Sequence, residues 1–230
     1  MNFLQDGVLS LKGLQPLAQG THRKVYVHPE LPGTVIKVML SNDEKPAAVG
    51  MQLFKRRLKD QLMPKLHYNF LYREYMTYLD IKIQQNMRGD RQKPPIAELR
   101  GMIDTDEGVG MLAESVELAS GELGHSISYL FRQKQLHLYL PQLNQFVREL
   151  FDWNIRINDL NEGNVVLGCY QNKMRFVIID GLGDSNLIPV KRWFGVLNRR
   201  SLQKRLRCIA KRVNLHWNSE LLEFQTLDTQ

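Results

Sequence analysis

Hydrophobic and polar positions change their spacing near the middle of the chain. In the first half, short runs rich in β-branched residues alternate with turns that contain Gly or Pro, a pattern typical of strands. The predicted strands cover Leu11–Leu17, Lys24–His28, Thr34–Met39, Ile96–Ile103 and Val109–Glu114. Between the third and fourth of these, apolar residues at helical spacing predict a helix over His67–Gln84.

Helical spacing dominates the second half. Leu136–Phe151 carries its apolar residues on one face, which predicts an amphipathic helix. We expect a hairpin from Val165–Leu167 and Phe176–Ile179, and a mostly helical segment over 189–222. The pattern favours an α+β fold in a single domain over residues 1–230. Its strand-rich N-terminal lobe would end at about 114, its hinge would cover about 115–121, and a shortened helical C-terminal lobe would follow over about 122–230.

Composition narrows the class of protein. The 230 residues are 43% hydrophobic and 24% charged, which is ordinary for a globular protein. The longest apolar runs, such as Phe176–Ile179, are too short to cross a bilayer, and the N-terminal residues lack the pattern of a secretory signal. Cys169 and Cys208 are too few for a disulfide framework and lack metal-binding spacing. We therefore expect a cytoplasmic protein without a transmembrane segment.

The net charge of +7 is unevenly distributed. No acidic residue lies between Asp184 and Glu220, whereas Lys191–Arg212 is rich in Lys and Arg. Such a block suits an anionic partner, for example a phosphate, a nucleic acid or an anionic membrane surface. The alternative is a solvated helix face without a partner.

The segment Asn158–Asn164 carries the strongest candidate chemistry. Asp159 and Asn164 lie five positions apart in a loop between a helix and a strand, which is their spacing in the catalytic loop of protein kinases. A carboxylate there orients the attacking hydroxyl and accepts its proton, and an Asn oxygen binds magnesium. The alternative is a loop in which these side chains only cap a turn.

Asp180 adds a second magnesium ligand at the expected place. The strand Phe176–Ile179 ends at this carboxylate, and Gly181 and Gly183 follow it. In kinases a strand-terminal Asp holds the metal that bridges the nucleotide phosphates. An ordinary Asp-Gly turn is the alternative.

Lys37 and Glu74 match the pair of charges that kinases place near the phosphates. Lys37 lies in a β-branched strand that resembles Val-Ala-Ile-Lys, and Glu74 lies in the next helix beside its apolar stripe. The alternatives are a solvated lysine and an intrahelical pair of Glu74 with Arg73 or Lys82.

A nucleotide-covering loop is expected at 18–25. Of its three usual glycines only Gly20 is kept, because Ala18 and Arg23 occupy the other two positions, and Val25 follows on the next strand. Fewer glycines allow less close approach of the backbone to phosphate. Glu114 is expected to reach the nucleotide at the start of the hinge.

Several of these segments together resemble the YrbL family, the PhoP-regulatory-network proteins of Gram-negative bacteria. The resemblance covers roughly Leu14–Val213, and the segments that carry it are Gly20–Pro29, Arg73–Tyr75, Asp159–Leu167 and Gly183–Pro189. It implies a cytoplasmic protein with a protein-kinase-like two-lobe fold that uses ATP and Mg. Ile157 and Asn158 stand where protein kinases have His and Arg, and Asn161 where Ser/Thr kinases usually have Lys. The motif Asp-Leu-Asn-x-x-Asn is closer to small-molecule and lipopolysaccharide-sugar kinases of the same fold. No Ala-Pro-Glu segment follows Asp180, so a full peptide-docking lobe is not expected.

Three functions remain open from the sequence. The first is ATP-dependent phosphotransfer to a hydroxyl of an unidentified small molecule, sugar or protein, in a PhoP-linked envelope or stress response, which the set Asp159, Asn164 and Asp180 favours. The second is a pseudokinase that binds nucleotide and regulates a partner, which the missing glycines favour. The third is nucleic-acid binding by the basic block, for which the sequence offers no known reading motif.

Overall fold

The structure is a computed structural model that describes residues 4–5, 7–40, 68–89, 92–183 and 195–227. The chain divides into two compact units. Unit 1 contains Met1–Tyr72 and Glu98–Ser115, and unit 2 contains Arg73–Ala97 and Val116–Gln230. The placement of the predicted lobes and hinge stays a prediction.

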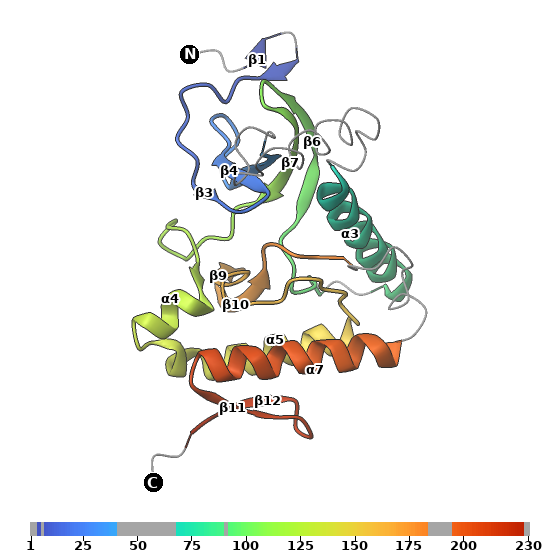
Figure 1. Cartoon of the computed structure of the whole chain (residues 1–230), viewed down its shortest axis with the longest axis vertical. Coiled ribbons are helices and arrows are strands. Elements are labelled where there is room, and N and C mark those ends of the chain that lie inside the picture. Colours follow the sequence, from blue (N-terminus) through green and yellow to red (C-terminus); the bar gives the residue numbers. More distant parts are fainter. Residues whose placement is uncertain (1–3, 6, 41–67, 90–91, 184–194, 228–230) are drawn as a thin grey trace, which may run out of the picture. The chain divides into compact units, whose positions relative to one another are not determined.

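Unit 1 is built on one seven-stranded sheet with the order β1-β2-β6-β7-β5-β4-β3 (Figure 1). All neighbouring strands are antiparallel except β2 and β6. The strands are β1 Leu4–Gln5, β2 Val8–Leu9, β3 Ala18–Gln19, β4 Arg23–Val27, β5 Thr34–Met39, β6 Leu99–Thr105 and β7 Gly108–Glu114.

Strand β5 is buried along its whole length. Ile36 and Val38 contribute to a hydrophobic core with Tyr26, Leu9 and Leu11. Because successive residues of a strand point to opposite faces, Lys37 lies on the other face of the sheet. A β-branched run buried on both faces is a strong strand signal, and the predicted strand Thr34–Met39 is confirmed at both ends.

The strand predicted over Leu11–Leu17 is wrong. Gly13 has φ +85°, and the N–H of Leu14 donates to the carbonyl oxygen of Leu11, so this segment turns. A left-handed residue suits glycine and interrupts a strand. The first strand of the hairpin that is predicted to cover the nucleotide is therefore the two-residue strand β3, Ala18–Gln19.

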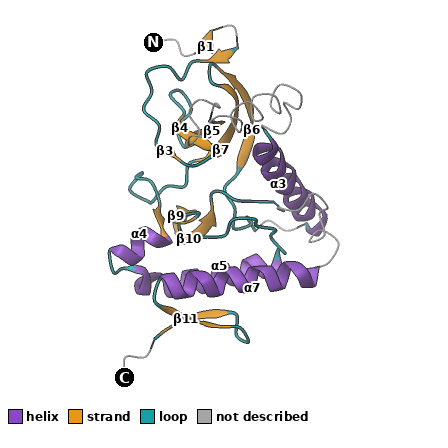
Figure 2. Cartoon of the chain, viewed as in Figure 1, coloured by secondary structure: helices purple, strands orange, loops and turns teal. Residues whose placement is uncertain are grey.

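Unit 2 is richer in helix and also contains two small sheets (Figure 2). Most of helix α3, Asn69–Arg88, belongs to it. Its other elements are β8 His125–Ser126, α4 Ile127–Arg132, the 3-10 helix η1 Leu136–Tyr139, α5 Leu140–Asp152, β9 Val165–Tyr170, β10 Lys173–Ile178, α7 Gly195–Arg212, β11 Leu215–Asn218 and β12 Glu223–Thr226.

Helix α5 packs against the hairpin β9–β10 in unit 2. Leu143, Phe146, Val147 and Leu150 are buried on one face of α5, and the ring of Phe146 lies 6.4 Å from that of Phe176 on β10. The hairpin turns at positions 171 and 172, both with positive φ. Both predicted elements are confirmed.

The prediction of a mostly helical 189–222 holds only in part. Residues 184–194 lie outside the described residues. They include Lys191, Arg192 and all but Gly183 of the segment Gly183–Pro189 that carries part of the family resemblance. Helix α7 ends at Arg212, and the chain then forms the antiparallel pair β11–β12. No described helix is both long and apolar enough to cross a membrane.

Candidate active site

The predicted catalytic loop of unit 2 connects α5 to β9. Ile155, Ile157 and Leu160 are buried at 0%, 1% and 4% exposure, so the loop is anchored by alternating apolar side chains. Asp159, between two of these anchors, is exposed. The loop therefore presents a carboxylate to solvent on an immobilised main chain.

Main-chain hydrogen bonds join this loop to the end of β10. The N–H groups of Asn158 and Asp159 donate to the carbonyl oxygen of Gly181, at 2.8 and 3.2 Å. The N–H of Gly183 donates to the carbonyl oxygen of Arg156 at 3.0 Å. Gly181 has φ +85°, and a Cβ there would lie 2.7 Å from the carbonyl oxygen of Asp159. Only glycine fits this approach, which brings the segments that carry Asp159 and Asp180 together.

Asn164 is part of the same network. Its Nδ2 donates to the main-chain oxygen of Asp159 at 2.9 Å and to Oδ2 of Asp159 at 3.3 Å. Its carbonyl oxygen accepts from the N–H of Ile179 at 2.9 Å. Three predicted site residues, Asp159, Asn164 and Asp180, thus belong to one hydrogen-bonded set of segments within unit 2.

Asn161 caps a turn of this loop. Oδ1 of Asn161 accepts hydrogen bonds from the N–H groups of Gly163 and Asn164, at 2.8 and 3.1 Å. This is an Asx-turn, in which an Asn side chain caps the main chain two residues on. Asn161 therefore shapes the loop, and Asn164, whose Nδ2 donates to the main-chain oxygen of Asp159, also caps it, so the turn-capping alternative applies to Asn164 in part.

The donor set suits magnesium. Mg²⁺ prefers oxygen ligands, and the carboxylate of Asp180 and the amide oxygen of Asn164 are of this kind. No group of three or more His, Cys, Asp or Glu side chains gathers around a common centre among the described residues. A site with one carboxylate and one amide would leave most positions to water and to nucleotide phosphates, as magnesium sites usually do.

In unit 1, a row of paired residues crosses the sheet at Lys37. Ala18 pairs with Val25, Val25 with Lys37, and Lys37 with Met111. Directly paired residues of antiparallel strands lie on the same face, so Ala18, Val25 and Lys37 share one face of the sheet. Lys37 is 5% exposed, and a buried ammonium needs compensating charge.

The loop predicted to cover the nucleotide is a tight hairpin. The N–H of Gly20 donates to the carbonyl oxygen of Arg23 at 2.9 Å, so only two residues remain in the turn between them. Arg23, partly buried at the start of β4, pairs with Met39 and lies on the face of Lys37. The ring of His22 in this turn stacks on Phe70 at 4.8 Å.

Glu114 lies on the other face of the sheet. It pairs with Thr34, three residues from Lys37, so its side chain points away from the row of Lys37. Its Oε2 accepts from the N–H of Glu98 at 2.9 Å. A nucleotide contact of Glu114 on the Lys37 face would therefore use its main chain.

Glu74 lies within the buried stripe of α3. It is 2% exposed, and Leu71, Tyr78 and Ile81 are buried at helical spacing around it. The expected position of Glu74 beside an apolar stripe agrees with this burial, although Phe70, four residues before it, is 47% exposed. Nearly complete burial of a carboxylate requires a partner that satisfies its charge.

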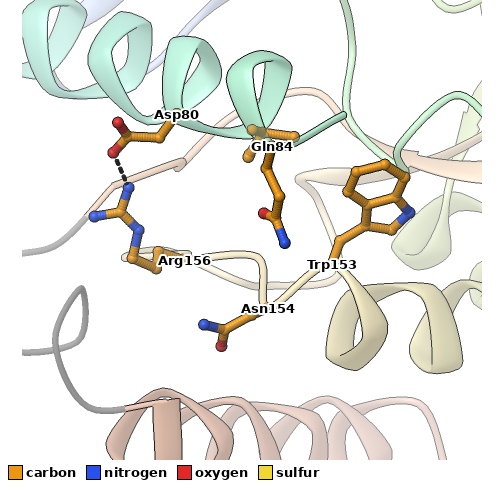
Figure 3. A pocket seen from close by; sticks show the side chains of 6 residues that line it. Asp80, Gln84, Trp153, Asn154 and Arg156 are labelled. Atoms are coloured by element: carbon orange, nitrogen blue, oxygen red, sulfur yellow. Dashed lines mark hydrogen bonds and ion pairs between the residues drawn. The ribbon is translucent and has the colours of Figure 1, made fainter. Parts of the chain in front are cut away.

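Two ion pairs near the catalytic loop could not be read from the sequence. Arg156, three residues before Asp159, pairs with Asp80 of α3 (Figure 3). Arg212 Nη1 lies 3.0 Å from Glu162 Oε2, and this hydrogen bond, with a smaller electrostatic contribution from Asp159, raises the pKa of the Arg212 guanidinium. The partners are far apart in sequence, so no local spacing signals them.

A small pocket lies beside the first of these ion pairs. It is lined by Asp80, Ile81, Gln84, Trp153, Asn154 and Arg156 (Figure 3). Its volume of about 170 Å³ is below the roughly 300–1,000 Å³ of most ligand sites, so it does not fit a nucleotide. The Arg88 guanidinium lies 5.0 Å from the centre of the Trp153 ring, which adds to the packing of this region.

Comparisons with known proteins agree with the resemblance seen in the sequence. The YrbL proteins of Escherichia coli (strain K12) and Shigella flexneri are each 23% identical over 193 residues, which is 81% of this chain and 79% of theirs. Among solved structures, the Mycobacterium tuberculosis PknI kinase domain is 18% identical, with a TM-score of 0.44 and coverage of 90% of this chain and 77% of that one. Rad53 in complex with AMP-PNP is 12% identical, with a TM-score of 0.45 and coverage of 86% and 46%.

The element order completes the comparison. A strand with a buried lysine, a helix with a buried glutamate, a loop with Asp159 and Asn164, and a strand that ends near Asp180 follow one another as in an α+β protein-kinase-like fold. The family of PhoP regulatory network proteins YrbL matches residues 9–214, which is most of the chain. The protein is therefore a member of the YrbL family.

Proposed function

We propose that this protein transfers the γ-phosphoryl group of ATP, with Mg²⁺, to a hydroxyl of an acceptor in the cytoplasm. The observation that carries the proposal is the hydrogen-bonded union of the catalytic loop with the end of β10. It supports the proposal because it joins the segments that carry the exposed carboxylate of Asp159 and the side-chain oxygens of Asn164 and Asp180, the kinds of group that phosphoryl transfer would use. A PhoP-linked envelope or stress response is the setting that the family name suggests.

Each residue has a separate role in this proposal. The Asp159 carboxylate orients the acceptor hydroxyl and takes its proton as the phosphoryl group passes to that oxygen and ADP leaves. Asn164 and Asp180 hold Mg²⁺, which neutralises charge on the phosphates when bound. Lys37 is the candidate phosphate ligand because it is a buried charge of the required type, and Glu74 is a second buried charge of the kind that kinases use near the phosphates. Val25, Ala18, Gly20 and Arg23 would cover the nucleotide, and Glu114 would contribute main-chain contacts.

A paired substitution tests these roles. Asp159→Asn keeps the shape of the side chain and both metal ligands, so ATP affinity should change by less than about 1 kcal/mol. Turnover should fall by roughly 10²–10⁴, the usual contribution of a positioned acid or base. Asn164→Ala should weaken both magnesium-dependent binding and turnover. Isothermal titration with Mg-ATP and a coupled ADP assay measure the two quantities.

The matched control is Asp152→Asn, the same change at an exposed carboxylate at the end of α5. It should leave affinity and turnover unchanged. Unchanged turnover in Asp159→Asn would remove that residue from the role of base. Loss of binding in the same variant would show that it acts on the nucleotide rather than on the acceptor.

A pseudokinase that binds nucleotide and regulates a partner is the second candidate. The tight Gly20–Arg23 hairpin, with Ala18 and Arg23 in place of glycines, favours it because this turn has little freedom to wrap phosphate. The two functions differ in one measurement. This measurement is the rate of ADP release. If the protein is a pseudokinase, the wild type binds Mg-ATP but releases ADP no faster than the Asp159→Asn variant with any acceptor.

A further inference from the structure

Helix α7 carries a continuous stripe of exposed cations. Arg200, Lys204, Arg207 and Lys211 are all exposed and follow one another at steps of four, three and four residues. Side chains at this spacing lie on one face of a helix. With a rise of 1.5 Å per residue the stripe is about 16 Å long. We call these four residues the basic stripe.

The basic stripe is not explained by contacts within the described part of the chain. Other cations of α7 have partners there: Arg199 lies 5.0 Å from the centre of the Phe151 ring, and Arg212 pairs with Glu162. The helix has no acidic residue, and like charges three or four residues apart destabilise a helix. The stripe therefore lowers the stability of α7 unless an external anion neutralises it.

The C-terminal end of the stripe lies next to the catalytic loop. Lys211 is followed directly by Arg212, which contacts Glu162, and Glu162 lies between Asp159 and Asn164 in the sequence. The buried residues of the same helix, Leu202, Leu206 and Ile209, face the interior. An anion bound along the stripe would thus have one end near the catalytic loop, whose Asp159 and Asn164 we assign to phosphoryl transfer, and would run from there along α7.

We infer that α7 docks the acceptor and that the acceptor is an acidic polypeptide segment. Its carboxylates would bind the basic stripe, and Arg212 would orient the part nearest to the hydroxyl that faces Asp159. An extended chain advances about 3.3 Å per residue and points every second side chain to one side, so about five or six residues span the stripe. This inference rests on the proposed phosphotransferase function and names its class of acceptor.

The surroundings of the stripe favour a polypeptide over other polyanions. Single-stranded nucleic acids bind surfaces where aromatic rings stack on the bases, and α7 contains no aromatic residue. A helix that lies in a membrane surface inserts its apolar face, whereas Leu202, Leu206 and Ile209, which form the apolar face of α7, are buried in the protein; only Val196 and Leu197 in its first turn are exposed large apolar residues of this helix. Clusters of Arg are a common means of recognising acidic peptide motifs.

Fluorescence anisotropy tests the docking separately from catalysis. The probe is a labelled peptide of about twelve residues that contains one Ser and a Glu at every second position. Two versions are used, one with the Glu residues before the Ser and one with them after it. In the control peptide each Glu is replaced by Gln. The wild-type protein should bind the Glu peptide and not the Gln peptide. The variant Arg200→Gln/Lys204→Gln/Arg207→Gln/Lys211→Gln should bind it roughly 10- to 100-fold more weakly, as expected for the loss of four exposed ion pairs.

A matched variant separates the stripe from net charge. Lys12→Gln, Arg132→Gln, Lys134→Gln and Lys173→Gln remove the same charge at four exposed positions on other elements, and should leave affinity unchanged. Equal weakening in both variants would overturn the inference. So would preferential binding of an oligothymidylate or of phosphatidylglycerol vesicles over the Glu peptide.

The active-site residues distinguish failure of docking from failure of catalysis. Asp159→Asn should bind the Glu peptide like the wild type, because its carboxylate is not part of the stripe. Arg212→Gln should weaken phosphorylation of the Ser more than peptide affinity, because it positions the end of the peptide nearest to Asp159. Peptide binding without phosphorylation would leave docking in place and refute the proposed function, whereas ATP turnover without peptide binding would refute docking alone.

Discussion

His28 shows how a single titratable side chain holds the turn between β4 and β5. It is buried, and its Nδ1 accepts hydrogen bonds from the N–H groups of Glu30 and Leu31, both at 3.1 Å. Burial lowers the pKa of His28 from its usual value of 6.5. The neutral ring therefore shapes the connection into the strand that carries Lys37.

Stability of the turn should depend on pH through this residue. Because the folded-state pKa lies below the unfolded value of 6.5, the contribution of His28 is complete above that pH and is lost as the pH falls towards the folded pKa. His28→Asn should flatten this dependence, since an Asn oxygen accepts at the same main-chain positions without titrating. Urea unfolding at several pH values between 5 and 8 measures the effect. An equally steep decline in wild type and variant would assign the pH dependence to other groups.

At the site, the sequence predicts the features that depend on neighbouring residues but not the contacts that form only when the chain folds. The spacing of Asp159 and Asn164 and the strand before Asp180 follow from local sequence, because loop and strand signals are local. The capping role of Asn161 was not predicted, since an Asx-turn is recognised by its hydrogen bonds. The Arg212–Glu162 pair joins residues that only the folded chain brings together.

At the scale of elements, α7 is fastened to the segment that precedes the catalytic loop. Asn198 is 1% exposed, and its Nδ2 donates to the main-chain oxygens of Asn154 and Ile155, at 3.2 and 3.0 Å, and to Oδ1 of Asn154 at 2.8 Å. These three acceptors lie where α5 ends and the loop begins. The helix that carries the basic stripe is thereby tied to the loop that carries Asp159.

Removal of the Asn198 side chain should lower the stability of the protein. Asn198→Ala leaves the buried carbonyl oxygen of Ile155 without this donor, and should lower the free energy of unfolding by about 1–3 kcal/mol. Lys204→Ala, an exposed substitution in the same helix, should change it by less than about 0.5 kcal/mol. Urea denaturation followed by circular dichroism compares the two. Equal stability of both variants would mean that Asn198 does not fasten the helix.

The elements that sequence predicted well are those whose burial is regular. The strand at Thr34–Met39 is a continuous β-branched run, and the helix predicted over Leu136–Phe151 keeps one helical period of apolar residues. The structure forms the strand as predicted, and the helical segment as the 3-10 helix η1 followed by α5. The segment after Arg212 lacks such a period, and Asn214, with φ +57°, turns the chain into β11. Trp217 and Phe224 then pack edge to face across the hairpin, a contact between strands that helical spacing does not anticipate.

For the whole molecule, nucleotide binding should appear as added stability. A ligand at a hundredfold excess over its dissociation constant stabilises a protein by about 2.7 kcal/mol, which is roughly 5–10 °C in melting temperature for a chain of this size. Mg-ATP should produce this shift and ATP with EDTA should not. Asp180→Asn should remove most of the magnesium-dependent part, with Asp152→Asn as the control. No shift in the wild type at millimolar Mg-ATP would exclude nucleotide binding.

The hydrogen bonds between the catalytic loop and the end of β10 also limit which substitutions the two segments can tolerate during evolution. A change that displaces the Gly181 carbonyl disturbs the main chain of Asn158 and Asp159 at once, and a change at Arg156 reaches Gly183 in the same way. Substitutions in such contacting segments do not add in free energy. The catalytic loop and the segment after β10 are therefore expected to change together in evolution. A neutral substitution in one segment limits which substitutions the other segment tolerates.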